Sequence, residues 1–220
     1  MTGPRLILLD LDGTLVDSFA DIRHGIEIAL GSIDVAPTDE LMDLCRLGVG
    51  LEVFYERALG RDPYAPAEQP HLDRFVNSYR AAYAESPHPT LAYEGVADTL
   101  AALRERHPGV ALAVATAKRT DMARAVVDDC GLGDLVDGVF GSEGLPHKPD
   151  PAVLQRAAAG VERELAGAVM IGDTDRDVIA ARNAGCLACA VTYGGWTRAE
   201  LAALAPDHLF DRFADVLDVI

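Results

Sequence analysis

Short apolar runs that end in polar residues recur along the chain, and this feature constrains its fold most. The first run, Leu6–Leu9, is followed directly by Asp10, a pattern typical of a strand buried on both faces of a sheet. Comparable runs lie at Ala111–Ala115, 139–140, 168–171 and Leu187–Val191. Segments of helical periodicity separate these runs. Short buried strands that alternate with helices predict an α/β fold with a doubly wound, Rossmann-like parallel sheet.

The stretch from residue 17 to residue 89 interrupts this alternation. Its apolar residues recur at helical spacing in roughly four segments, which turn-rich segments with glycine and proline separate. No part of the stretch has the pattern of a buried strand. We therefore expect an all-helical insert at residues 17–89, within an α/β core domain made of residues 1–16 and 90–220.

The chain is strongly acidic, with 35 Asp and Glu residues against 19 Lys and Arg residues and a formal net charge of −16. This excess argues against binding to polyanionic nucleic acid or to an anionic membrane surface. A small anionic substrate is compatible with it if a metal cation or a few local bases screen the charge. The sequence has no secretory signal and no apolar run near the ~18 residues of a membrane span, so we expect a cytoplasmic protein.

Lysine and cysteine usage adds two narrower expectations. Only two of the 19 basic residues are lysines, Lys118 and Lys148, and both follow short apolar runs. A compact ammonium group suits a phosphate or carboxylate where a planar guanidinium would not fit. Cys186 and Cys189 form a C-x-x-C pair without a second pair or a histidine cluster. We therefore expect them to be buried small hydrophobes rather than zinc ligands.

Two pairs of aspartates follow two of the expected strands. Asp10 and Asp12 come directly after the first run, and Gly13 lets the backbone turn away behind them. Asp173 and Asp177 follow the fourth run, at the start of an expected helix. A surface turn or a helix cap accounts for either pair alone, but not for both at the strand ends where open α/β sheets bind ligands. Carboxylates gathered there repel one another, and Mg²⁺, which prefers a few carboxylates and a substrate phosphate, would relieve that repulsion.

Two further loops complete the expected site. Thr116, Ala117 and Lys118 end the second run and can offer a hydroxyl and backbone N–H groups to phosphate oxygens. Lys148 follows the third run and supplies a fixed cation. Each signal alone is weak, because such residues also occur in solvated loops. Their order is more informative: four consecutive runs are followed by two Asp, a Thr, a Lys and two more Asp.

These motifs resemble those of the haloacid dehalogenase superfamily, specifically its phosphatase branch with a helical cap inserted after the first motif. Asp10-x-Asp12-Gly-Thr14 is similar to motif one, Thr116 to motif two, Lys148 to motif three and Gly172-Asp173-Thr-x-x-Asp177 to motif four. Within the superfamily the chain is most similar to phosphoglycolate phosphatases, through residues 10–18, 46–50 and 181–185. Ala117 departs from the pattern, because many relatives have Asn there, and this leaves substrate detail open.

The resemblance implies a reaction in two steps. Asp10 would be the nucleophile that accepts the phosphoryl group as an aspartyl phosphate. Asp12 would protonate the leaving alkoxide and then deprotonate the water that hydrolyses the intermediate. Mg²⁺ on Asp10, the Asp12 carbonyl and Asp173 would screen the charge of two approaching anions. The second aspartate argues against a dehalogenase, because halide leaves without needing a proton.

The resemblance also implies roles for the remaining residues. Thr116 and Lys148 would hold the phosphoryl oxygens, and Asp177 would orient Lys148 or metal-bound water. The cap would close over the site, exclude water and select the substrate. Its Arg46 could pair with a substrate carboxylate or be a solvated helix arginine.

The expected protein is a Mg²⁺-dependent phosphatase of small phosphate monoesters, with phosphoglycolate as the leading substrate. It would act on a small phosphorylated metabolite as a monomer or homodimer. A β-phosphoglucomutase-like phosphomutase uses the same two aspartates and is the near alternative. A non-enzymatic phospho-relay receiver module also combines Asp, Thr and Lys on a doubly wound sheet. Such modules lack the acid partner of the D-x-D pair and the long helical insert, so this alternative is disfavoured.

Overall fold

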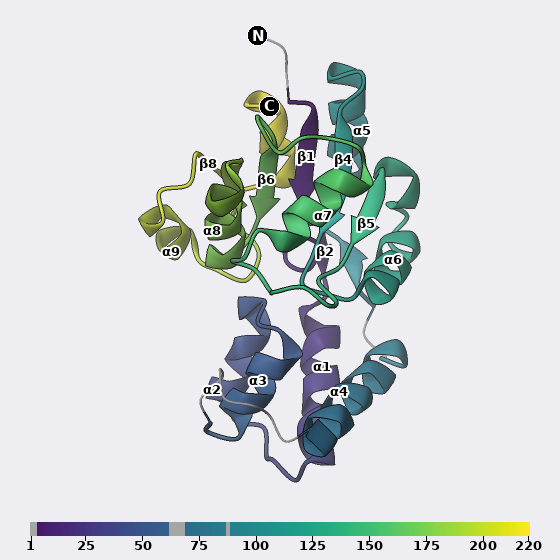
Figure 1. Cartoon of the computed structure of the whole chain (residues 1–220), viewed down its shortest axis with the longest axis vertical. Coiled ribbons are helices and arrows are strands. Elements are labelled where there is room, and N and C mark those ends of the chain that lie inside the picture. Colours follow the sequence, from purple (N-terminus) through teal and green to yellow (C-terminus); the bar gives the residue numbers. More distant parts are fainter. Residues whose placement is uncertain (1–3, 62–68, 87–88) are drawn as a thin grey trace. The chain divides into compact units, whose positions relative to one another are not determined.

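The computed structural model describes residues 4–61, 69–86 and 89–220 (Figure 1). The described residues divide into two compact units. One unit comprises the described residues up to Asp17 together with Leu91–Ile220, and the other lies within Ser18–Thr90. None of the helices described is both long and apolar enough to cross a membrane.

The first unit is built on a six-stranded parallel sheet, as the apolar runs predict. Its strands lie in the order β5-β4-β1-β6-β7-β8, so sequence neighbours are not always neighbours in the sheet. The bounds are β1 (Leu6–Leu9), β4 (Ala111–Ala115), β5 (Gly138–Phe140), β6 (Val169–Gly172), β7 (Leu187–Val191) and β8 (His208–Phe210). Strand β8 was not among the expected runs, because a histidine begins it and only two apolar residues follow.

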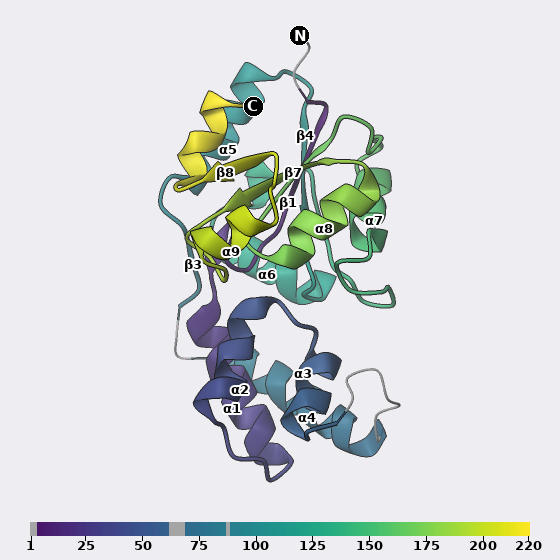
Figure 2. The same cartoon turned by 90° about the vertical axis from the view of Figure 1, so that its left-hand side faces the viewer.

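Helices cover both faces of this sheet, which confirms the doubly wound α/β fold (Figure 2). Helices α7 and α8 pack on one face, and α5 and the 3₁₀ helix η3 lie together on the other. Because both faces are covered, Leu6 and Leu8 face the α7–α8 core while Ile7 and Leu9 are equally buried. The bounds are α5 (Val96–Arg106), α6 (Thr120–Asp129), η2 (Gly133–Leu135), α7 (Ala152–Gly160), α8 (Asp175–Ala184), α9 (Arg198–Ala203) and η3 (Phe213–Asp218).

A second, two-stranded sheet lies where the chain leaves this unit and where it returns. Strands β2 (Val16–Asp17) and β3 (Leu91–Ala92) pair antiparallel, with Val16 opposite Ala92. Two residues are too few to give a periodic signal, which is why the sequence did not predict this pairing. The pairing holds the outgoing and incoming strands side by side.

The second unit is helical over the residues described, with α1 (Phe19–Ser32), α2 (Asp39–Asp43), the 3₁₀ helix η1 (Leu44–Leu47), α3 (Leu51–Ala58) and α4 (Gln69–Ala84). Helix α1 packs against α4, and α3 meets α4 through the stacked rings of Phe54 and Phe75, whose centroids are 6.2 Å apart. The helical segment from Asp39 to Leu47 is divided between the α-helix α2 and the 3₁₀ helix η1. The chain then turns at Gly48, whose φ of 59° lies in the left-handed region that glycine tolerates best.

Both cysteines of the C-x-x-C pair are buried and free, as expected for small core residues. Cys186 immediately precedes β7, and Cys189 lies within that strand. Burial raises the pKa of Cys186 to about 11 and that of Cys189 to about 12. The two thiols are therefore protonated and inert near neutral pH.

Candidate active site

The register of the sheet brings three of the predicted site residues to one edge. Leu9 of β1 lies opposite Val114 of β4 on one side and Ile171 of β6 on the other. Asp10 follows directly and donates its backbone N–H to the Ile171 carbonyl at 2.9 Å. Because the strands are parallel, Thr116 and Asp173 follow their own strands at the same edge. We call this edge the carboxyl edge.

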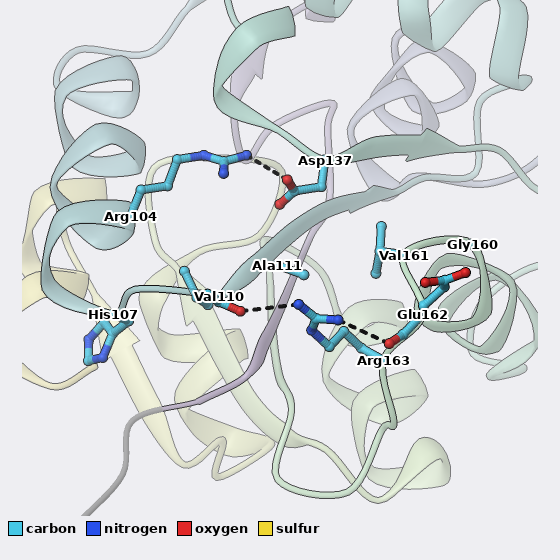
Figure 3. Close-up of a pocket in the computed structure, with 10 residues that line it drawn as sticks. Arg104, His107, Val110, Ala111, Asp137, Gly160, Val161, Glu162 and Arg163 are labelled. Carbon is cyan, nitrogen blue, oxygen red and sulfur yellow. Dashed lines mark hydrogen bonds and ion pairs between the residues drawn. The ribbon is translucent and has the colours of Figure 1, made fainter.

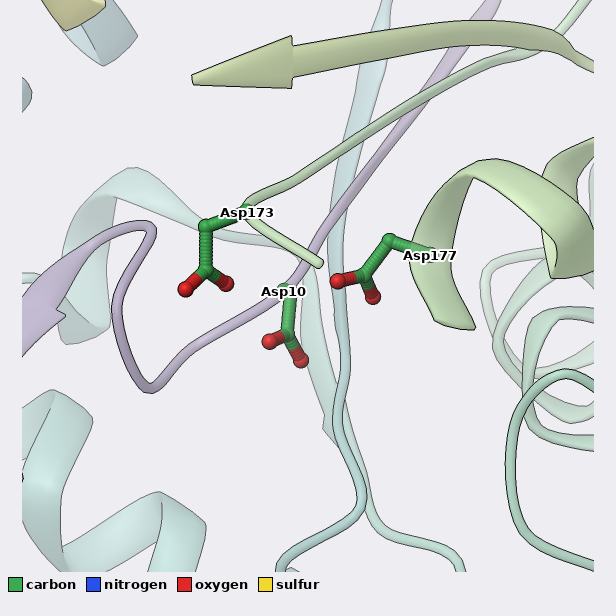
Figure 4. Close-up of side chains that lie close together, drawn as sticks. All are labelled: Asp10, Asp173 and Asp177. Carbon is green, nitrogen blue, oxygen red and sulfur yellow. The ribbon is translucent and has the colours of Figure 1, made fainter. Parts of the chain in front are cut away.

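Three carboxylates gather at the carboxyl edge. Asp10, Asp173 and Asp177 each offer an oxygen that lies within 4.8 Å of the other two, and we call these three residues the acidic cluster (Figure 4). Asp173 is 1% exposed and Asp177 is 2% exposed. Burial raises the pKa of Asp10 to about 7, and the neighbouring Asp177 and Asp12 charges add to that rise against the opposing effect of Lys148. Burial and then Asp177 and Asp10 raise the pKa of Asp173 well above its usual range.

Lys148 lies inside the acidic cluster, as the motif order predicts. Its Nζ donates to Asp10 Oδ1 at 2.9 Å and to Asp177 Oδ1 at 2.7 Å, and the residue is 4% exposed. Burial alone would lower the Lys148 pKa, but the two aspartates raise it above its ordinary value. The lysine is therefore charged and offsets part of the negative charge of the cluster.

The path of the chain explains how Lys148 reaches this position from β5, two strands away from β1. The connection from β5 to β6 must pass β4 and β1, because those strands lie between them. Helix α7 accordingly contacts β5, β4 and β1 on its way. The loop before α7 is held from the far side, where Arg176 donates to the Lys148 carbonyl at 3.0 Å and Asn183 to the Pro149 carbonyl at 3.0 Å.

Asp173 is held at both carboxylate oxygens. Thr14 Oγ1 donates to Asp173 Oδ1 at 3.1 Å, and the Gly195 N–H donates to Oδ2 at 2.6 Å. Gly194 has no space for a side chain, because a Cβ there would lie closer than 3.0 Å to the Gly13 carbonyl and to the Asp173 carboxylate. The hydroxyl of Tyr193 donates to the Thr14 carbonyl at 2.7 Å.

Sequence reasoning missed this 193–195 loop. It follows β7, the fifth apolar run, so the strand-end argument that found Asp10 and Asp173 extends to it. The backbone N–H that it contributes has no residue signature, whereas the absence of a side chain at Gly194 does: the pair Gly194-Gly195 after a buried run was the available signal.

Asp177 combines two roles in the structure. Its Oδ2 accepts hydrogen bonds from the Thr174 N–H at 3.1 Å and from Thr174 Oγ1 at 2.7 Å, which closes a capping box at the start of α8. Its Oδ1 accepts from Lys148. The Asp177 side chain therefore caps helix α8 and also contacts Lys148, the predicted cation of the site.

Asp12 and the loop after β4 meet through an ion pair. Lys118 Nζ lies 3.0 Å from Asp12 Oδ1, and their side chains are only 6% and 19% exposed. The Thr116 hydroxyl accepts from the Lys118 N–H at 3.2 Å, and the carbonyl of Ala117 accepts from the Ser142 hydroxyl at 2.7 Å. Ser142, from the loop after β5, was not predicted. The expected substrate contacts of residues 116–118 stay predictions.

Arg46 belongs to the helical unit and lies in η1, with its guanidinium carbon 5.0 Å from the centre of the Phe19 ring. It is exposed, and its position over an aromatic face is typical of a cation–π contact. Its expected contact with a substrate carboxylate is not tested by these neighbours and stays a prediction.

Comparison with known proteins agrees with this geometry. The model of the haloacid dehalogenase-like hydrolase family matches residues 7–191 of the chain. Phosphoglycolate phosphatase 1 of Pseudomonas aeruginosa is 34% identical over 97% of this chain and 79% of its own length. The phosphoglycolate phosphatase of Rhodospirillum rubrum is 35% identical over 98% of this chain and 90% of its own length. A solved structure described as a predicted phosphoglycolate phosphatase from Haemophilus somnus 129pt has a TM-score of 0.83 at 30% identity, covering 100% of this chain and 99% of that one.

The chain therefore belongs to the haloacid dehalogenase-like hydrolase family. The family assignment confirms the resemblance inferred from the motifs. It also confirms the expected enzyme class, a phosphoric monoester hydrolase similar to phosphoglycolate phosphatases.

Proposed function

We propose that the chain is a Mg²⁺-dependent phosphatase of small phosphate monoesters that works through an aspartyl phosphate on Asp10. The observation that carries the proposal is the buried acidic cluster, two members of which, Asp10 and Asp177, are bridged by Lys148. Phosphoglycolate is the leading substrate, because the relatives named above are phosphoglycolate phosphatases that match 97% and 98% of this chain. In this proposal the protein acts on a small phosphorylated metabolite in the cytoplasm, as a monomer or a homodimer.

The acidic cluster fits a hard divalent cation. Three carboxylates share a site with one lysine, so the fully ionised cluster keeps an excess of negative charge. Magnesium binds oxygen ligands and accepts one or two carboxylates together with waters and a substrate phosphate. In this proposal Asp10 and Asp173 are the direct ligands, together with the Asp12 carbonyl. Asp173 accepts from neutral donors, the Thr14 hydroxyl and the Gly195 N–H, so its charge remains available to the ion. Asp177 instead caps α8 through Thr174 and accepts from the Lys148 ammonium, which offsets its charge. When bound, the ion would supply positive charge that screens the two anions as they approach.

The first step is phosphoryl transfer to Asp10. A carboxylate oxygen of Asp10 attacks phosphorus, the bond from phosphorus to the substrate oxygen breaks, and Asp12 gives its proton to the leaving alkoxide. Lys148 lies 2.9 Å from the Asp10 carboxylate, so it holds the nucleophile and carries positive charge to the phosphoryl oxygens. The Thr116 hydroxyl, at the end of β4, is placed to share that contact in the proposal.

The second step is hydrolysis of the aspartyl phosphate. Asp12, now a carboxylate, takes a proton from water as the water oxygen attacks phosphorus. The bond from phosphorus to the Asp10 oxygen breaks, which releases inorganic phosphate and restores both aspartates. In this proposal the helical unit serves as the cap that excludes water and selects the substrate, and Arg46 pairs with a carboxylate of the substrate.

The test is phosphate release across a panel of phosphate monoesters, with and without Mg²⁺, for the wild type and for Asp10→Asn. We expect Mg²⁺-dependent release that is highest for phosphoglycolate, and a loss of about 10⁴-fold or more in Asp10→Asn because no nucleophile remains. Mg²⁺ should also raise the thermal midpoint of the wild type but not of Asp173→Asn, a readout that does not depend on turnover. Asp129→Asn, a change in an exposed aspartate at the end of α6, is the matched control.

Three outcomes would contradict parts of the proposal. Full activity in Asp10→Asn would rule out the aspartyl phosphate. Release confined to sugar phosphates would rule out phosphoglycolate as substrate. Interconversion of hexose phosphates without net phosphate release would favour the phosphomutase alternative.

A further inference from the structure

The ion pair between Lys118 and Asp12 joins two loops of the carboxyl edge. Asp12 follows β1 and Lys118 follows β4, and their charged atoms are 3.0 Å apart. The lysine side chain is 6% exposed and the aspartate side chain 19% exposed, so water screens the pair much less than it screens a surface pair. The contact therefore fixes the Asp12 carboxylate more firmly than an exposed salt bridge would.

The choice of lysine at this position adds to the argument. The chain has 17 arginines and two lysines, and both lysines pair with aspartates of the same edge. A compact ammonium reaches one carboxylate oxygen as a point charge, whereas a planar guanidinium demands space for a fork of donors. The side chains of Lys118 and Asp12 are 6% and 19% exposed, and this largely buried setting suits the compact ammonium better than the guanidinium fork.

The backbone of Lys118 is held by its own loop and by the loop after β5. The Lys118 N–H donates to the Thr116 hydroxyl at 3.2 Å, and its carbonyl accepts from the Ser142 N–H at 3.4 Å. A Cβ at Gly141 would lie closer than 3.0 Å to the Lys118 carbonyl, so the two loops are in close contact. The backbone of Lys118 is therefore held in place, and its ammonium group can in turn hold the Asp12 carboxylate.

Asp12 benefits from such a partner because it lies near another carboxylate, Asp10. Its carboxylate acts on Asp10 as a neighbouring negative charge. A carboxylate beside an acidic cluster is repelled from it unless a cation stands on its other side. Lys118 supplies that cation.

We propose that Lys118 is a positioning residue, which holds the Asp12 carboxyl group where it exchanges a proton with the leaving oxygen of the substrate. The inference rests on the proposed function, in which Asp12 is the acid and then the base. It assigns to Lys118 a role through Asp12, and direct contact of Lys118 with the substrate becomes the competing outcome.

The test compares substrates whose leaving groups differ in their need for a proton. The leaving alkoxide of an alkyl phosphate must be protonated, whereas 4-nitrophenolate leaves without help. For Lys118→Met we expect kcat/KM to fall about 10²-fold with the preferred alkyl phosphate, the order of effect of a displaced general acid, and less than about 5-fold with 4-nitrophenyl phosphate. Equal losses with both substrates, or a rise in KM at constant kcat, would overturn the proposal and favour direct contact with the substrate.

Four further variants control the test. Asp12→Asn should reproduce the dependence on the leaving group, and the double variant should lose little more than either single variant, because the two residues act as a unit. Additive losses would contradict the proposal. Lys118→Arg keeps the charge and should recover part of the loss. Arg119→Met removes the neighbouring exposed cation and should leave kcat/KM unchanged.

Two further comparisons distinguish failure of the proposed role of Lys118 from failure of the proposed function. If Lys118→Met does not unfold cooperatively, Lys118→Gln, which also removes the charge but keeps a polar side chain, is compared with Asp12→Asn instead. A shared dependence on the leaving group supports the proposal, and its absence from Lys118→Gln overturns it. If the wild type releases no phosphate from any monoester, the proposed function fails. If the wild type is active but no Lys118 variant depends on the leaving group, only the role of Lys118 fails.

Discussion

Charged residues gather at both edges of the parallel sheet, but the two groups differ in burial and in the balance of positive and negative charge. The carboxyl edge holds the acidic cluster and Lys148 in a buried setting. The opposite edge has a hollow of about 470 Å³, which we call the amino-edge hollow (Figure 3). Charged residues line it as well, among them Arg104, His107, Asp137, Glu162 and Arg163.

The charges of the amino-edge hollow are largely accounted for by the fold. Arg104 pairs with Asp137 at 3.0 Å, with about a third of each side chain exposed. Arg163 donates to the carbonyls of Glu162 at 3.1 Å and Gly109 at 3.3 Å. Arg104 lies in the last turn of α5, where a cation also stabilises the helix dipole. Opposite charges in partial contact with water need no ligand to stay together.

The carboxyl edge is different because like charges are held together where water is excluded. Burial raises the pKa of Asp10 and of Asp173, which is the sign of carboxylates that lack enough compensating charge. Clustered charge alone therefore does not mark a functional site. Burial together with an excess of negative charge distinguishes the carboxyl edge. Three substitutions test this difference between the two edges.

The largest effect is expected from Lys148→Met. Removing the cation leaves Asp10 and Asp177 buried without their partner, and breaking a buried pair costs about 3–5 kcal/mol of unfolding free energy. The phosphatase activity should fall at least about 10³-fold, because the cation that faces the phosphoryl oxygens is lost. Denaturant unfolding and phosphate release measure the two effects. A stable, active Lys148→Met protein would contradict the central place that we give this lysine.

An intermediate effect is expected from Gly194→Ala. The new Cβ would collide with the Gly13 carbonyl and with Asp173, so Asp173 must shift. A displacement of about 1 Å at a reacting site costs about 10²-fold in rate. The activity loss should come with a weaker rise of the thermal midpoint on addition of Mg²⁺. Gly31→Ala is the matched control, because a Cβ there meets nothing within 4 Å, and it should leave activity unchanged.

The smallest effect is expected from Arg104→Met in the amino-edge hollow. Partly exposed ion pairs contribute about 0–1 kcal/mol, so the unfolding free energy should change by no more than that. Activity should stay within about twofold of the wild type, since surface substitutions away from special features are usually tolerated. A loss of activity comparable to that of Lys148→Met would break the contrast between the two edges and point to a function for the hollow.

The sequence by itself determined the sheet and the edge at which the site lies. Continuous apolar runs identify the strands because buried parallel strands are apolar on both faces. Asp10, Thr116 and Asp173 then follow from position alone, since each comes directly after such a run. The family follows from the same residues, and membership is confirmed by the relatives.

Only the tertiary structure decided which charged groups meet. Lys148 reaches Asp10 across 138 positions because the β5–α7 loop passes β4, the strand that lies between β5 and β1. Lys118 meets Asp12 because β4 and β1 are neighbours, and Gly195 supports Asp173 through a backbone N–H that any residue carries. Residue type and local spacing are properties of short segments, whereas pairing between loops depends on strand order. Local periodicity therefore gave the elements, and packing of the whole sheet selected the contacts between them.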